Sequence, residues 1–180
     1  MSDSNKLVEI IEEVYERYYG DVYKFLICYT GNRNDAEDLT QEVFMRVIKS
    51  YSTFNNGSKL KTWILSIAKH VAIDHMRRRK FLSIFKESFF HQLPSSKKTP
   101  YEILQFNENK KQLYEAIFAL KTKYKAVIIL RGINEYSIKE TAEILDCSES
   151  KVKVDYHRGL IALKKILHIG NEEEVFNNAN

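Results

Sequence analysis

The sequence predicts an all-α protein made of two small helical domains joined by a flexible linker. Apolar residues recur at helical spacing over long stretches, and the 180 residues include only 2 Pro and 6 Gly. A hydrophobic content of 44% is sufficient for packed cores. Both prolines, Pro94 and Pro100, lie in the segment 81–106 beside a Ser-Ser-Lys-Lys run. We therefore expect domains at 1–80 and 107–169, a linker at 81–106 and a frayed acidic tail at 170–180.

The charge is modest overall but unevenly distributed. The net charge is +4, and residues 107–170 hold 12 Lys or Arg against 8 Asp or Glu, whereas residues 171–180 hold three Glu and no base. The carboxy-terminal domain is thus more basic than the total suggests, although such a charge by itself is common in proteins that bind no nucleic acid. Cys28 and Cys147 lack the number and spacing of a disulfide framework or metal motif, so we expect two buried thiols. The acidic amino terminus and the absence of an apolar run of about 20 residues predict a cytoplasmic protein.

The amino-terminal domain is expected to contain three helices. The first covers 7–30, either unbroken or interrupted near Gly20. After a turn, Asn34 is predicted to cap a second helix that ends near Ser50, with Glu37 completing a capping box. A polar loop containing aromatic residues follows, and a third helix is expected from about Leu60 to Lys80.

A carboxylate stripe lies early in the second helix. Asp35, Asp38 and Glu42 fall on one face, with Gln41 beside it. The helix macrodipole explains Asp35 but not Glu42, which lies beyond the first turn. A docking face for a basic partner is the alternative, and the spacing alone leaves both open.

The third helix and the loop before it carry candidate nucleic-acid contacts. The outer side of the helix is predicted to hold Trp63, Ser66, His70, Asp74 and Arg77, and four cations at 77–80 form a phosphate site at its end. The rings of Tyr51, Phe54 and Trp63 flank the loop and are suited either to trapping an unstacked base or to ordinary core packing. Together with His75, His70 and Asp74 resemble a set of metal ligands. His75 is expected to point away from the other two, however, and no distant ligand is evident, so we expect no metal site.

The carboxy-terminal domain contains the pattern of a helix-turn-helix. Ser137 and Glu140 form a capping box, Asp146-Cys147-Ser148 makes the turn, and Ser148 caps a second helix. The inner face of that helix includes Gly159, where a close approach of a neighbouring helix is expected. Its outer stripe is expected to contain the following residues: Ser150, Lys153, Val154, His157 and Arg158, with Lys151 beside Ser150 at the amino end.

The chemistry of this stripe suits the major groove of DNA. Arg158 can contact guanine with two hydrogen bonds, Lys153 can reach a base or phosphate, and Val154 can touch a thymine methyl. Ser150 and Lys151 lie at the amino end of the helix, where phosphate is favoured. The capped helices and the division between inner and outer faces together predict DNA binding.

Three runs resemble the extracytoplasmic-function (ECF, group four) sigma factors of bacterial RNA polymerase. They are GNRNDAEDLTQEVFMRVIKSYSTF, KTWILSIAKHVAIDHMRRR and the helix-turn-helix, while SIAKHVAID, AVIILR and SESKVK resemble the sigma-X branch of Bacillus-type bacteria. The resemblance covers about residues 10–168. It implies two all-α domains called region two and region four, promoter recognition, DNA melting, and a regulon for envelope stress. It also implies three partners: the beta and beta-prime subunits of core RNA polymerase, promoter DNA, and a membrane-anchored anti-sigma factor.

The resemblance assigns roles to the candidate residues. Polymerase contacts are expected from Asp35, Asp38, Gln41, Glu42 and Arg46. Contacts to the minus-ten element are expected from Tyr51, Phe54, Asn55, Ser58, Lys61, Trp63, Ser66, His70, Asp74, Arg77 and Arg78. The minus-thirty-five element would be read by the stripe from Ser150 to Arg158. His70 stands where many members carry Asn, which changes the expected promoter code.

Two other functions are compatible with parts of the pattern. A stand-alone regulator would bind duplex DNA without polymerase, usually as a dimer, but no dimer heptad supports it. A nuclease using His70, Asp74 and His75 would require a metal. The preferred interpretation is a sigma factor that is a monomer when free and has no catalytic residues, cofactor or small-molecule substrate.

Overall fold

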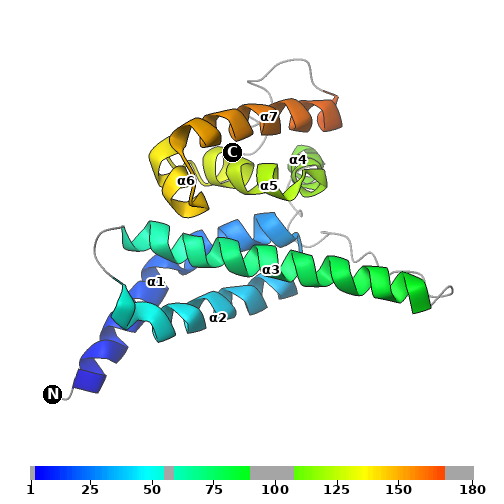
Figure 1. Ribbon diagram of the computed structural model, residues 1–180. Helices are drawn as coiled ribbons and strands as arrows, with labels where there is room; N and C mark the ends of the chain where they lie inside the picture. Colours follow the sequence, from blue (N-terminus) through cyan, green and yellow to red (C-terminus); the bar gives the residue numbers. More distant parts are fainter. Residues whose placement is uncertain (1–2, 55–58, 90–107, 169–180) are drawn as a thin grey trace.

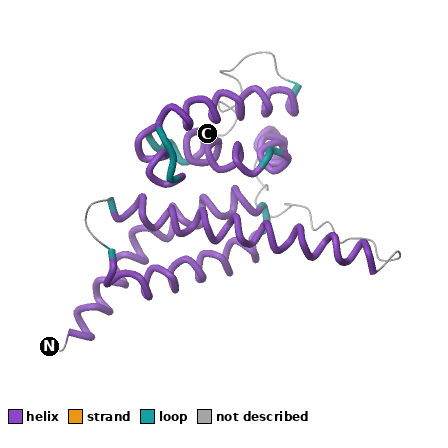
Figure 2. Tube along the Cα trace, viewed as in Figure 1, coloured by secondary structure: helices purple, strands orange, loops and turns teal. Residues whose placement is uncertain are grey.

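The described part of the chain consists of helices and short loops and contains no strand, as the all-α prediction requires. The computed structural model describes residues 3–54, 59–89 and 108–168. Three helices form the amino-terminal domain: α1 (Asp3–Thr30), α2 (Arg33–Ser50) and α3 (Leu60–Phe89), with a 3₁₀ turn, η1, at Tyr51–Thr53. The carboxy-terminal domain contains α4 (Glu108–Ala119), α5 (Thr122–Ile128), a π-helical turn, η2, at Ile129–Ile133, α6 (Ile138–Leu145) and α7 (Glu149–Leu167). Figure 1 shows these two groups as two layers, and Figure 2 shows the short loops between helices.

Apolar faces at helical spacing form the core of each domain. In α2 the predicted inner residues Ala36, Leu39, Val43 and Val47 are all buried. They pack against α1 and α3, whose buried residues include Phe25 and Ile64. The predicted inner face of α7 is likewise buried at Val152, Gly159 and Leu163.

The start of α2 differs from the prediction. The cap is Asn32, whose side chain accepts the backbone N–H of Asp35 at 2.9 Å, and Asn34 already lies inside the first turn. Asn32 has the extended backbone of a cap, whereas Gly31 before it has φ 63°, so the turn is completed two residues earlier than expected.

Two other helices are longer than expected. α1 continues through Gly20, where a side chain would meet nothing within 4 Å, and the packing of Val22 and Phe25 maintains the helix. α3 continues to Phe89 instead of ending near Lys80, because residues 81–89 contain neither Pro nor Gly. The first part of the predicted linker is therefore helical. The rest of that linker and the acidic tail lie outside the described residues.

The two cysteines differ in burial. Cys28 is buried, as predicted, and burial raises the pKa of its thiol to about 12. Cys147 is only half-buried, because it lies in the turn between α6 and α7. The prediction of a second buried thiol was wrong.

Candidate nucleic-acid and protein interfaces

The helix-turn-helix forms as the caps predict. The Ser137 hydroxyl accepts the Glu140 N–H at 3.1 Å, while the Glu140 carboxylate accepts the Ser137 N–H at 3.0 Å. The Ser137 hydroxyl also donates to the Glu140 carboxylate at 2.7 Å, and the two hydrogen bonds that this carboxylate accepts from Ser137 lower the pKa of Glu140. α6 ends at Leu145, and its C-cap residue Asp146 adopts the left-handed conformation with φ 53°. Ser148 then accepts the Lys151 N–H at 3.2 Å and starts α7. Both helix starts thus coincide with the predicted caps.

The predicted outer stripe of α7 points to solvent because the opposite face of the helix packs against α5. At Gly159, an added Cβ would lie 2.9 Å from Cγ1 of Ile128, so the helices can approach this closely only with glycine there. The exposed residues of α7 include Ser150, Lys153, Val154, His157 and Arg158, and Val154 is 46% exposed. An apolar side chain is therefore held in water in the middle of a basic face, an arrangement suited to base contact.

Lys151 differs from the rest of this stripe. Its ammonium is bound by the carboxylate of Asp155, which raises the pKa of Lys151. The Asp155 side chain is itself only 12% exposed. The ammonium group of Lys151, which the sequence predicted to contact phosphate, is thus paired with Asp155 within the helix.

The predicted outer side of α3 is exposed at His70 and at its cationic carboxy-terminal end. His70, Arg77 and Arg78 are exposed, whereas Trp63, Ser66 and Asp74 are half-buried. Arg77 donates to the Asp74 carboxylate at 2.6 Å, and His70 Nδ1 lies 2.7 Å from the Ser66 carbonyl oxygen. His75 faces a different partner, with its Nε2 3.4 Å from the carboxylate of Asp35. The three residues of the metal-like set thus have different environments.

The aromatic residues around the loop form a ring pair. The ring centroids of Phe54 and Trp63 are 4.8 Å apart, and both rings, like that of Tyr51, are half-buried. Lys61 lies nearby, with its ammonium 3.0 Å from the Asp21 carboxylate. The candidate residues Asn55 and Ser58 lie outside the described residues.

The carboxylates of α2 do not share one surface. Asp38 and Gln41 are exposed, whereas Asp35 turns toward α3, where its carboxylate accepts from Arg79 at 3.1 Å. Glu42 accepts from Arg46 at 2.5 Å. The exposed face thus contains Asp38 and Gln41, with the Glu42–Arg46 pair at its side.

Two apolar residues on this face were not predicted. Met45 is 54% exposed and Ile48 is 42% exposed, in a helix whose other apolar side chains are buried. Met45 and Ile48 follow Gln41 by four and seven residues, a spacing that puts them on the same side of the helix as Asp38. The sequence alone could therefore have predicted their position. Apolar side chains exposed together beside polar ones are typical of a protein-binding surface.

The described residues contain no group of three or more His, Cys, Asp or Glu side chains placed to hold a metal ion. None of the helices they form is both long and apolar enough to cross a bilayer.

Comparison with known proteins relates both domains to transcription initiation. Residues 14–81 match the family model for sigma-70 region 2, and residues 110–163 match the model for sigma-70 region 4. The chain is 42% identical to the ECF RNA polymerase sigma factor SigX of Bacillus subtilis over 170 residues, which is 92% of this chain and 87% of the relative. It is 32% identical to the RNA polymerase sigma factor YlaC of the same organism, over 91% of this chain and 95% of the relative.

A solved structure supports the fold. The sigma factor RpoE of Bartonella quintana, crystallised with the anti-sigma factor NepR, is similar to this chain with a TM-score of 0.69 at 22% identity. The match covers 89% of this chain and 98% of the other. With α1–α3 as region two and α4–α7 as region four, the chain belongs to the extracytoplasmic-function family of bacterial sigma factors.

Proposed function

We propose that this sigma factor reads the minus-thirty-five promoter element with α7. The proposal rests on an exposed stripe of α7, whose opposite face packs closely against α5 at Gly159. The stripe contains Lys153, Val154, His157 and Arg158. Arg158 contacts a base edge, Lys153 a base or phosphate, and Val154 a thymine methyl. Ser150 lies at the amino end of α7 and contacts phosphate, and Lys151, which is paired with Asp155, lies at the same end.

Region two binds the minus-ten element along α3. Arg77 and Arg78 contact the duplex backbone, and His70 lies on the same exposed side. The Phe54–Trp63 pair, with Tyr51, borders the pocket that takes a base out of the stack. Asn55, Ser58 and Lys61 complete this site, together with Ser66 and Asp74. Unstacking one base costs a few kcal/mol, which stacking on these rings and phosphate contacts offset.

Core RNA polymerase binds the exposed face of α2. Asp38 and Gln41 supply polar contacts, the Glu42–Arg46 pair flanks them, and Met45 and Ile48 supply apolar area. Asp35 stabilises this face indirectly, because its ion pair with Arg79 joins α2 to α3. The beta-prime and beta subunits perform the chemistry of transcription, so the sigma factor directs initiation without catalytic residues or a cofactor of its own.

An anti-sigma factor restrains this protein until a signal releases it. Two solved structures similar in fold are complexes of this kind, one with NepR and one with the cytosolic domain of CnrY. The restraint of a two-domain sigma factor by a membrane-anchored partner fits a cytoplasmic protein that controls a cell-envelope stress regulon.

Run-off transcription tests the proposal. Purified core polymerase is incubated with genomic fragments of the source bacterium, with and without the protein. Discrete starts that appear only with the protein are expected, and aligning their upstream sequences gives the promoter code. Absence of starts, combined with tight duplex binding by the protein alone, would indicate a stand-alone regulator instead.

A further inference from the structure

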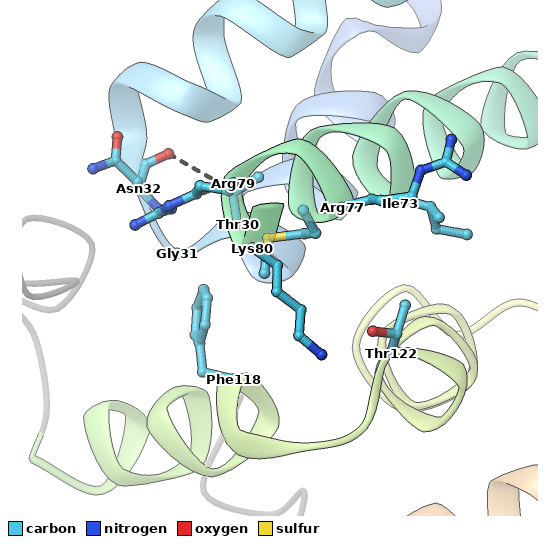
Figure 3. A pocket seen from close by; sticks show the side chains of 10 residues that line it. Thr30, Gly31, Asn32, Ile73, Arg77, Arg79, Lys80, Phe118 and Thr122 are labelled. Atoms are coloured by element: carbon cyan, nitrogen blue, oxygen red, sulfur yellow. Dashed lines mark hydrogen bonds between the residues drawn. The ribbon is translucent and has the colours of Figure 1, made fainter. Parts of the chain in front are cut away.

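A cavity of about 580 Å³ lies between residues 73–80 of α3 and the α4–α5 part of region four (Figure 3). The α1–α2 turn, residues 30–32, closes one side of it, and Phe118 and Thr122 border the other. Cavities of this volume accept ligands as large as a nucleotide. The chemistry of the lining decides which class of ligand the cavity suits.

The charged side chains of the lining are cations. Arg77, Arg79 and Lys80 border the cavity, and none of the lining residues that the structure describes is acidic. In Figure 3 the Lys80 side chain extends toward the space between Phe118 and Thr122. Guanidinium and ammonium groups bind phosphate oxygens through short, charge-assisted hydrogen bonds. The lining therefore favours an anionic ligand.

The two arginines are positioned by carboxylates outside the lining. Arg77 donates to Asp74 at 2.6 Å, and Nη1 of Arg79 donates to Asp35 at 3.1 Å. A guanidinium carries several N–H donors, so a single hydrogen bond of this kind does not use all of them. The Arg77 and Arg79 side chains are 77% and 55% exposed. Each arginine is thus fixed beside the cavity and can still donate to a ligand.

A buried cation next to the cavity also lacks a counterion. Lys125 of α5 is 4% exposed, and its ammonium lies 4.8 Å from the ring centroid of Phe118. No residue that the structure describes forms an ion pair with it. Burial lowers the pKa of Lys125 to about 8. An anion bound beside Phe118 would offset part of the cost of burying this charge.

The lining also offers apolar area that a bare phosphate would leave unused. Ile73 and Met76 contribute it from α3, and Phe118 contributes a half-buried ring. The ring lies against Gly31, where an added Cβ would come within 1.8 Å of it. Aromatic rings stack on nucleobases of any sequence, and methionine adapts to irregular ligand surfaces. A ligand that joins a flat base to several phosphates therefore matches the whole lining.

We propose that this cavity binds a nucleoside polyphosphate, with Arg79 and Lys80 on its phosphates and Phe118 against its base. The ligand is regulatory, since no group that could transform it lines the cavity among the described residues. Because the cations belong to region two and the ring to region four, one bound molecule contacts both regions. This inference goes beyond promoter recognition and does not depend on the proposed roles of α3 and α7.

Isothermal titration calorimetry of the full chain, without polymerase or promoter, tests the site. The probes are ATP and GTP, and their separate parts are represented by adenosine, guanosine and inorganic tripolyphosphate. We expect at least one nucleotide to bind roughly tenfold more tightly than either of its parts. Failure of both nucleotides to bind at millimolar concentration would overturn the proposal. So would equal affinity for tripolyphosphate, which would show an adventitious anion only.

Two neighbouring arginines provide a matched pair of variants. Arg79→Ala should weaken nucleotide binding roughly tenfold, because charge-assisted hydrogen bonds to phosphate are lost. The protein should remain folded, since the ion pair that Arg79 forms is partly exposed and contributes little stability. Arg78→Ala is the control, because Arg78 is exposed and does not line the cavity. Equal weakening by both variants would indicate diffuse attraction to the cationic part of α3 and would contradict a defined site.

Phe118→Leu tests the placement of the base. It removes the ring but keeps apolar volume, so it should weaken nucleotide binding and leave tripolyphosphate binding unchanged. Equal weakening for both probes would contradict contact between the ring and the base. The arginine comparison decides the proposal even if Phe118→Leu does not fold. Run-off transcription decides the promoter proposal separately, because none of these titrations involves DNA.

Discussion

Arg158 is the residue of α7 best suited to distinguish one base from another. Its guanidinium is exposed on the reading face and can form two hydrogen bonds to guanine. His157, beside it, can donate or accept, and Lys153 acts as a point charge. Base discrimination at the minus-thirty-five element is thus expected to depend on Arg158 more than on its basic neighbours.

Arg158→Ala should weaken promoter binding by about 1–3 kcal/mol and relax specificity at one base pair. The measurement is initiation by the polymerase complex from promoters with single substitutions in the minus-thirty-five element. Lys165→Ala is the control, since it removes an equal charge from an exposed site of α7 outside the reading stripe. Wild-type rates of Arg158→Ala on every promoter would show that Arg158 reads no base.

Lys125 should make folding stability depend on pH. Its pKa is about 8 in the folded protein against 10.5 ordinarily, and the cause is burial. Between these values the unfolded chain holds a proton that the folded chain has lost, so stability rises with pH through this window. Below pH 8 both states are protonated, and the folded state carries the full cost of the buried charge.

Lys125→Met should therefore be more stable than the wild type at neutral pH, by up to about 3 kcal/mol. The difference should shrink as pH rises from 8 to 10.5. Thermal unfolding of the two proteins across this range measures it, with Lys123→Met as the exposed control. If the difference in stability between the wild type and Lys125→Met stayed constant across this pH range, Lys125 would not be buried as a cation.

At the scale of elements, the caps of α6 and α7 define the helix-turn-helix. The reciprocal bonds of Ser137 and Glu140 start α6, and Ser148 starts α7 after the left-handed Asp146. In the proposed promoter complex the register of α7 determines which side chains reach DNA, so we expect the cap to contribute to recognition as well as to stability.

Ser148→Ala should destabilise the protein by about 1 kcal/mol, because the Lys151 N–H loses its acceptor. Ser148→Asp should restore most of the loss, since a carboxylate also caps and complements the helix dipole. Denaturant unfolding measures both. Ser150→Ala is the control for loss of a serine at this end of α7. Equal stability of Ser148→Ala and Ser150→Ala would contradict the capping role.

The exposed face of α2 should determine polymerase affinity. Asp38→Arg reverses a charge on this face without disturbing an ion pair of the described residues, and Glu42→Arg also breaks the pair with Arg46. Both should lower co-purification with core polymerase, while Glu16→Arg, on an exposed part of α1, should not. Unchanged co-purification of both α2 variants would exclude this face as the docking site.

At the scale of the whole molecule, the proposed function requires α3 and α7 to engage the promoter together. Region two and region four are separate helical layers (Figure 1), and core polymerase is expected to set the distance between them. Initiation is then expected to depend on the rotational position of the minus-ten and minus-thirty-five elements around the duplex as much as on their sequences.

Inserting five base pairs between the two elements should reduce initiation at least roughly tenfold. The insertion rotates one element by about half a helical turn relative to the other. A ten-base-pair insertion restores the phase but not the distance and should remain defective. Run-off transcription from the three promoters measures this. Full activity with the five-base-pair insertion would show that region four does not bind DNA while region two does.

Local signals in the sequence were sufficient for the helix-turn-helix, its caps and its inner and outer faces. Capping and helical periodicity involve residues three to seven positions apart, so Ser137, Ser148 and the α7 stripe could be predicted. The family followed from the same residues. The cap at Asn32 was missed because two asparagines near the turn offer the same chemistry, and the backbone at Gly31 decides between them.

Only the tertiary structure decided where the charged residues point. Asp35 was predicted on the docking face, but it meets Arg79, a residue 44 positions later, on α3. Lys69 and Lys125 are ordinary lysines in the sequence, and they are buried because two domains close over them. Such contacts join residues that are far apart along the chain, and no local period encodes them. The sequence by itself therefore determined the helices and their chemistry, whereas the packing of region four on region two determined which lysines are buried and which remain exposed.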